Sequence, residues 1–233
     1  MQNNIVYRPS YSLLQLIMDA GESIRAESGA MVSMTPNVQI ETAARGGLLG
    51  GLKRAVLGGE SFFINTFTCQ GGPGEMTLAP CLPGDMMHVP LTGGSMFVQS
   101  GSYVCSSGSI EVDTSWAGAK GFFSGEGLFL LKCTGQGDLF LSSYGAIHMV
   151  ELQAGQQYLV DTGHMVAFEE TITYKVQAIG GLKSTVFSGE GLVCNFSGPG
   201  RLYLQSRSMD AFLKFLIPKL PKSGGGGGIS IGG

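Results

Sequence analysis

Three glutamates that each follow a glycine are the first candidates for chemistry in this sequence. Glu60, Glu126 and Glu190 each close a glycine-rich segment, and they recur at nearly equal separations along the chain. Carboxylates gathered from equivalent positions could bind a cation or the basic groups of a partner. The alternative is structural: each carboxylate could accept backbone N–H groups where a strand begins. The pattern favours the structural interpretation.

A basic, glycine-rich segment is the second candidate. Arg45, Lys53 and Arg54 flank the run GGLLGGL, and a glycine loop beside basic residues can bind phosphate through its backbone amides. The spacing of a phosphate-binding P-loop is missed, because Leu52 precedes Lys53 and Arg54 stands where Ser or Thr is required. The segment is therefore either an interaction surface or a loop that packs on its own apolar residues, and nucleotide hydrolysis is not predicted.

The other reactive side chains lack catalytic or metal-binding spacing. The three histidines form no H-x-H or H-E-x-x-H motif, and the five scattered cysteines form no C-x-x-C pair. Neither a G-x-S-x-G elbow nor a G-x-G-x-x-G turn between a strand and a helix is found. We therefore expect no enzyme, no cofactor and no metal site. Scattered, mostly buried thiols favour a reducing compartment, so we expect a cytoplasmic protein.

Composition predicts a packed protein of many short strands. The chain has 233 residues, of which 43% are hydrophobic and 13% charged, and 38 are glycine. Glycine spread through alternating apolar segments indicates many turns and bulges. The net charge of −3 argues against a nucleic-acid partner. No apolar run of about 18 residues is found, so a membrane-spanning helix is not expected.

An internal repeat is the main architectural signal. Each copy has two glycines eight residues apart, then a loop ending in Gly-Glu, then a segment that reads as a hairpin. We expect an all-β fold of three antiparallel β-sandwich or double-stranded β-helix-like units around a pseudo-threefold axis. The predicted units are residues 1–84, 85–146 and 147–208. The paired glycines are Gly21 and Gly29, Gly93 and Gly101, and Gly155 and Gly163.

The C-terminal segment departs from the repeat. Apolar residues of 206–220 fall at helical spacing, with Ser208 or Asp210 as the cap and Pro218 as the stop. The predicted helix spans 209–222, and a flexible glycine-rich tail spans 223–233. The helix either packs on the β core, which the pattern favours, or docks on a membrane or partner. The candidate docking residues are Phe212, Lys214, Phe215 and Leu216.

Four runs resemble one family. They are YRPSYSLLQL, ESGAMVSM, ARGGLLGGLKRAVLGGESFF and RSMDAFLKFLIPKLP. The sequence resembles the domain-of-unknown-function family that includes the "altered inheritance of mitochondria" protein twenty-four. The resemblance covers nearly the whole chain and implies a triplicated fold like that of the tryptophan RNA-binding attenuation protein. It also implies that fungal relatives associate with the mitochondrial inner membrane and its complexes.

Together these observations favour a non-enzymatic scaffold or interaction protein. We expect it to be a homo-oligomer and to associate with membrane complexes or a membrane surface. One alternative is a small-molecule or ion-binding module that holds its ligand between repeats. RNA binding is a weaker alternative, because the acidic charge balance opposes it.

Overall fold

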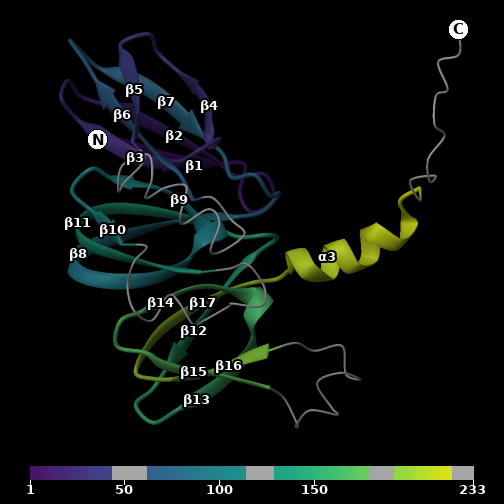
Figure 1. The fold of residues 1–233 in the computed structure, drawn as a ribbon. Helices are drawn as coiled ribbons and strands as arrows, with labels where there is room; N and C mark the ends of the chain where they lie inside the picture. Colours follow the sequence, from purple (N-terminus) through teal and green to yellow (C-terminus); the bar gives the residue numbers. More distant parts are fainter. Residues whose placement is uncertain (44–61, 114–128, 179–191, 222–233) are drawn as a thin grey trace, which may run out of the picture.

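The computed structural model describes residues 1–43, 62–113, 129–178 and 192–221, which fold into antiparallel β-sheets (Figure 1). Among these residues the one α-helix is α3 (Met209–Leu216), close to the C-terminus. The predicted all-β class with a short C-terminal helix is thereby confirmed. The predicted unit boundaries stay predictions.

The strands fall into three consecutive groups. The first group contains β1 (Gln2–Val6), β2 (Leu13–Met18), β3 (Ser23–Glu27), β4 (Met31–Met34), β5 (Val38–Ala43), β6 (Ile64–Cys69) and β7 (Gly74–Leu78). The second contains β8 (Met86–Gln99), β9 (Tyr103–Ser107), β10 (Glu111–Asp113) and β11 (Leu130–Ser142). The third contains β12 (Ile147–Leu152), β13 (Gln157–Asp161), β14 (Met165–Glu169), β15 (Thr173–Ala178), β16 (Leu192–Ser197) and β17 (Gly200–Gln205). Short 3-10 helices span Ser100–Ser102, Thr162–His164 and Ile217–Lys219.

Strand pairing follows the same scheme in each group. In the first group β7 pairs with β2 and β4, while β6 pairs with β3 and β5. In the third group β17 pairs with β12 and β14, while β16 pairs with β13 and β15. In the second group, the long strands β8 and β11 each correspond to two separate strands of the other groups. One end of β11 pairs with the start of β8 and with β9, and its other end pairs with the end of β8 and with β10.

Two further pairings join the groups edge to edge. Strand β3 pairs with β9, and β8 pairs with β14, which yields a sheet of ten strands that runs through all three groups. In Figure 1 the groups follow one another in a row, with the first and third at opposite ends. The pseudo-threefold arrangement that the sequence predicts is therefore not confirmed. Edge-to-edge pairing extends a sheet in one direction, so it does not require the groups to surround an axis.

Alternating apolar residues explain why these segments form strands with one buried face. In β2, Leu14, Leu16 and Met18 are buried, whereas Gln15 and Ile17 between them face solvent. This period of two is typical of a sheet with one face in the core. The buried side chains form three apolar clusters, and each cluster combines residues from adjacent groups.

The predicted hairpins are wrong in their pairing. The strands β6 and β7 are consecutive, but they belong to different sheets, and the same holds for β16 and β17. The glycine turns between them carry the chain from one sheet to the other. Gly71 has a φ of 74° and Gly200 a φ of 144°, values that residues with a side chain rarely adopt. The turn residues therefore mark a change of sheet, and each strand finds its partner elsewhere.

Candidate functional site

The candidate binding residues from the sequence lie outside the described part of the chain. These residues are Glu60, Glu126, Glu190, Arg45, Lys53 and Arg54. Their proximity to one another therefore stays a prediction. Within the described ranges, no three or more His, Cys, Asp or Glu side chains lie together in a way that could hold a metal ion. The described features that could serve function are a buried carboxylate and the helix α3.

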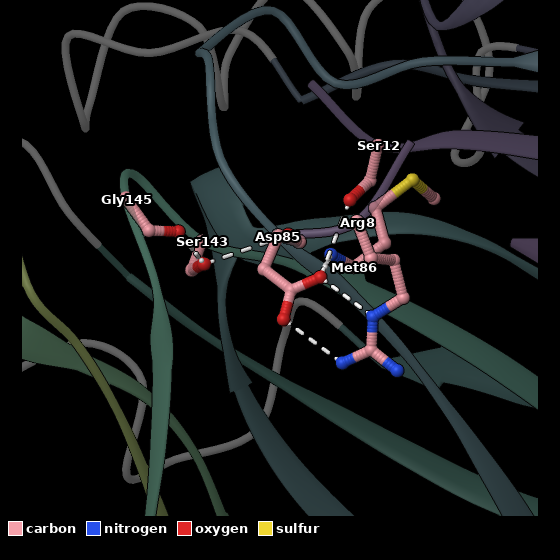
Figure 2. A network of polar contacts seen from close by, with 6 residues as sticks. All are labelled: Arg8, Ser12, Asp85, Met86, Ser143 and Gly145. Carbon is pink, nitrogen blue, oxygen red and sulfur yellow. Dashed lines mark hydrogen bonds and ion pairs between the residues drawn. The ribbon is translucent and has the colours of Figure 1, made fainter. Parts of the chain in front are cut away.

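The buried carboxylate belongs to Asp85, at the start of the second strand group (Figure 2). Arg8 donates to it through Nε, 2.7 Å from Oδ1, and through Nη2, 2.8 Å from Oδ2. The Ser12 hydroxyl donates to Oδ1 at 3.2 Å, and the Met86 backbone N–H donates to Oδ1 at 2.8 Å. A bidentate arginine pair with two further donors is among the stronger polar arrangements in proteins.

This environment sets the charge of Asp85. Burial alone would raise the pKa of the carboxyl, but the hydrogen bonds from Arg8, Met86 and Ser12 outweigh it and hold the pKa below its usual value. The same pairing raises the pKa of Arg8. The Arg8 side chain itself is half exposed. Asp85 is therefore charged, and its carboxylate already accepts hydrogen bonds from Arg8, Ser12 and Met86. This arrangement suits a structural role better than proton transfer.

Backbone hydrogen bonds join the Asp85 region to the first strand group and to the segment that follows the second group. The Ser12 N–H donates to the carbonyl of Gly84 at 3.1 Å, and the Asp85 N–H donates to the carbonyl of Gly145 at 2.9 Å. The Ser143 N–H donates back to the Asp85 carbonyl at 3.0 Å. At Gly84 a Cβ atom would lie 1.8 Å from the Ser143 carbonyl oxygen, so this position requires glycine. The sequence patterns did not single out Asp85, whose partner Arg8 lies in the quoted run YRPSYSLLQL.

The five cysteines differ in accessibility. Cys81 is exposed, whereas Cys69, Cys105, Cys133 and Cys194 are buried. Burial raises the pKa of the Cys133 thiol to about 12 and raises that of Cys105 as well. The sequence prediction of mostly buried thiols is thereby confirmed.

Native-state labelling of the cysteines should therefore be selective. We expect iodoacetamide to modify Cys81 in the folded protein and the other four cysteines only after denaturation, because the thiolate is the reacting species and needs access to the reagent. Peptide mass spectrometry with and without urea measures this. Rapid native labelling of Cys105 would contradict the buried position that the structure gives it.

Helix α3 extends away from the β-sheets in Figure 1. It begins at Ser208, whose side chain accepts a hydrogen bond from the Ala211 N–H at 3.4 Å, as expected for an N-cap. Ser208 is itself buried. The helix ends at Leu216 and a 3-10 turn containing Pro218 follows, so the predicted cap at Ser208 and stop at Pro218 are confirmed, but the helix is shorter than the predicted 209–222.

The favoured prediction that this helix packs on the β core is wrong. None of its residues is buried, and the aromatic contact with the body joins Phe212 to Tyr144 at a centroid distance of 6.1 Å. Of the candidate docking residues, Phe212, Lys214 and Phe215 are exposed and Leu216 is half-buried. The large exposed apolar side chains of the segment are Phe212, Leu213, Phe215, Ile217 and Leu220. Helical spacing alone does not reveal which surface, if any, covers the apolar face.

Two lysines border the exposed apolar residues. Lys214 lies within α3, and the Lys219 ammonium group lies 4.3 Å from the centre of the Phe215 ring. No helix in the described part of the chain is both long and apolar enough to cross a membrane. The arrangement suits attachment to a surface through a short amphipathic segment.

Comparison with known proteins decides the family. The family model described as "Mitochondrial biogenesis AIM24" matches residues 3–207. The chain belongs to the AIM24 family. An uncharacterised protein of Streptococcus pyogenes serotype M6 is 29% identical over 221 residues, which is 91% of this chain and 88% of that protein. The crystal structure of protein SPYM3_0169 from Streptococcus pyogenes is also similar, with a TM-score of 0.78 and 28% identity. That likeness covers 94% of this chain and 99% of the crystallised one.

The AIM24 match has a consequence for the two features described above. Arg8, Ser12 and Asp85 lie inside the matched residues, whereas α3 begins just after the match ends. The Asp85 junction thus belongs to the AIM24 body.

Proposed function

We propose that this AIM24-family protein is a non-enzymatic interaction protein that docks on an anionic membrane surface through α3. The observation that carries the proposal is an apolar helix with no buried residue, anchored at its first turn and extended from the β body. Exposed aromatic residues beside lysines are typical of segments that lie in the membrane interface. The membrane association that the family resemblance implies points the same way.

A lipid surface suits the exposed apolar and basic side chains of α3 better than an apolar groove on a partner protein. Phe215 is 61% exposed and Ile217 is 60% exposed, so both can enter the acyl boundary without any rearrangement of the body. Lys214 and Lys219 can then face the headgroups, and each contributes about 1 kcal/mol beside an anionic surface. Burying one Phe side chain contributes roughly 1.5–3 kcal/mol more. The combined attraction is that of a reversible peripheral contact.

Vesicle co-sedimentation tests this proposal. The full chain is expected to sediment with phosphatidylglycerol-containing vesicles and to sediment less with pure phosphatidylcholine. A chain that ends after Ser208 is expected to stay in the supernatant, because it lacks the apolar helix. Ending there retains Ser208, which lies against Gly163 in the body, so the body should stay folded.

A pair of point variants provides the matched control. Phe215→Ser is expected to weaken binding to anionic vesicles roughly tenfold or more, since a fully inserted ring contributes over 1.4 kcal/mol. Phe63→Ser removes another exposed ring, from the β body, and is expected to leave binding unchanged. Equal sedimentation of the full chain and the shortened chain would remove the membrane role of α3.

A further inference from the structure

The two pairings that join the strand groups have the same register. Between β3 and β9 the Cα partners are Ile24 with Ser107, Arg25 with Ser106, and Ala26 with Cys105. Between β8 and β14 the Cα partners are Met96 with Glu169, Phe97 with Phe168, and Val98 with Ala167. Ile24 and Met96 each lie three residues after a glycine with positive φ, Gly21 and Gly93 respectively. On the opposite strands, Cys105 and Ala167 each lie four residues after the second glycine of their copy. The same strand pairing between consecutive groups, called the joint below, therefore occurs twice in the chain.

At each joint, a valine of the later group packs into the apolar core of the group before it. Val104 and Val166 occupy the same irregularity in their strands, where one residue is skipped in the pairing with β11 or β17. Val104 belongs to the core cluster of the first group, and Val166 belongs to that of the second. Both are fully buried. The joint thus combines strand pairing with insertion of an apolar side chain.

In the first group, β4 corresponds to β9 and β14, but no described strand pairs with its outer edge. Strand β4 shows the same skipped residue in its pairing with β7, and that residue is Val32. Val32 is 56% exposed, in contrast to Val104 and Val166. Among the described strands, β4 is one of the two edges of its four-stranded sheet. Its outer edge corresponds to the edges that β9 and β14 use to join the preceding group.

In the third group, β13 corresponds to the strands β3 and β8 that pair with the following group at the two joints. Strand β13 follows Gly155 as β3 follows Gly21, and it is an edge of its three-stranded sheet among the described strands. Counting from these glycines, Tyr158 and Leu159 occupy the positions of Met96 and Phe97. Leu159 is 58% exposed, whereas Phe97 is buried in the joint with β14. An apolar edge strand of this kind tends to pair with another strand.

We propose that β13 of one chain pairs with β4 of the next, so that a second copy of this chain completes the joint. The shared register predicts antiparallel Cα partners, namely Leu159 with Met34 and Val160 with Ser33. Val32 then enters the apolar cluster around Phe168 and Phe196 of the neighbouring chain. Because β4 and β13 belong to the groups at opposite ends of the row, the contact is head to tail and generates a ring or a filament. The joint does not depend on lipid docking by α3.

Sedimentation velocity tests the assembly. The full chain is expected to form species larger than a monomer, and so is the chain that ends after Ser208. Val32→Glu and Leu159→Glu should each convert the protein to a monomer, because each places a charge in a joint that would otherwise be buried. Both residues are exposed within one chain, so the fold should be unaffected. Ile17→Glu is the control at an exposed position outside the proposed joint, and it should leave the assembly intact.

Disulfide trapping tests the register. In a Cys81→Ser background, Met34→Cys combined with Leu159→Cys should yield intermolecular disulfides, since paired Cα atoms lie within bridging distance. Met31→Cys combined with Leu159→Cys is the shifted control and should yield few. A monomer at all concentrations, assembly that survives both glutamate variants, or equal trapping of the shifted pair would overturn the proposal.

Discussion

Phe168→Ala is expected to lower the free energy of unfolding by about 3–5 kcal/mol, the range for truncating a buried phenylalanine. The Phe168 side chain is fully buried in β14. Its ring centre lies 5.2 Å from those of Phe97 and Phe196, and 5.3 Å from that of Tyr174. Phe97 belongs to the second strand group and is the Cα partner of Phe168. The substitution therefore leaves a cavity at the joint between two groups.

Urea denaturation followed by circular dichroism measures this loss. Phe215→Ala is the matched control, because it makes the same chemical change on a side chain that is 61% exposed. We expect the control to change the free energy of unfolding by no more than about 0.5 kcal/mol. A loss at Phe168 as small as that at Phe215 would contradict the aromatic packing described above.

Much of the local structure could be predicted from the sequence. Alternation in Leu13–Met18 identifies a strand and its buried face, because side chains in a strand point to opposite sides in turn. The helix after Ser208 could be predicted with its cap and its stop, since capping depends on residues close in sequence. Of the paired glycines, Gly21, Gly29 and Gly155 do lie at turns with positive φ, which restricts the choice of residue, whereas Gly93 lies within β8.

Pairing between strands could not be predicted in the same way. Consecutive strands such as β6 and β7 have alternating patterns that fit a hairpin as well as they fit a change of sheet. The pattern determines the faces of a strand, but it does not determine which edge meets which partner. The position of α3 away from the core was missed for a related reason. An apolar helical face requires a cover, and the sequence does not say whether protein or lipid provides it.

The Asp85 junction could not be found from spacing, because its partners Arg8 and Ser12 come from the other end of the first strand group. An isolated aspartate after a Pro-Gly pair predicts only a turn. Its burial, and therefore its importance, follows from tertiary contacts. The residues that did recur at equal spacing, Glu60, Glu126 and Glu190, lie outside the described residues.

Asp85→Ala is expected to lower the free energy of unfolding by about 2–3 kcal/mol at neutral pH. The variant removes the acceptor of two hydrogen bonds from Arg8 and leaves the buried Ser12 hydroxyl without that partner. The loss is smaller than for a fully buried ion pair, because Arg8 is half exposed and water can replace the carboxylate. Glu111→Gln removes an exposed carboxylate on β10 and serves as the control, with an expected change within about 0.5 kcal/mol.

The dependence of stability on pH separates the charge of Asp85 from its size. Because folding lowers the pKa of this carboxyl, its contribution is complete above the unfolded pKa of about 3.9. It is lost as the pH falls from that value through the folded pKa, since the protonated form no longer attracts the Arg8 guanidinium. Urea midpoints measured from neutral to acidic pH should therefore fall less steeply in Asp85→Asn than in the unmodified chain. Parallel curves for the two proteins would show that the paired carboxylate does not govern acid stability.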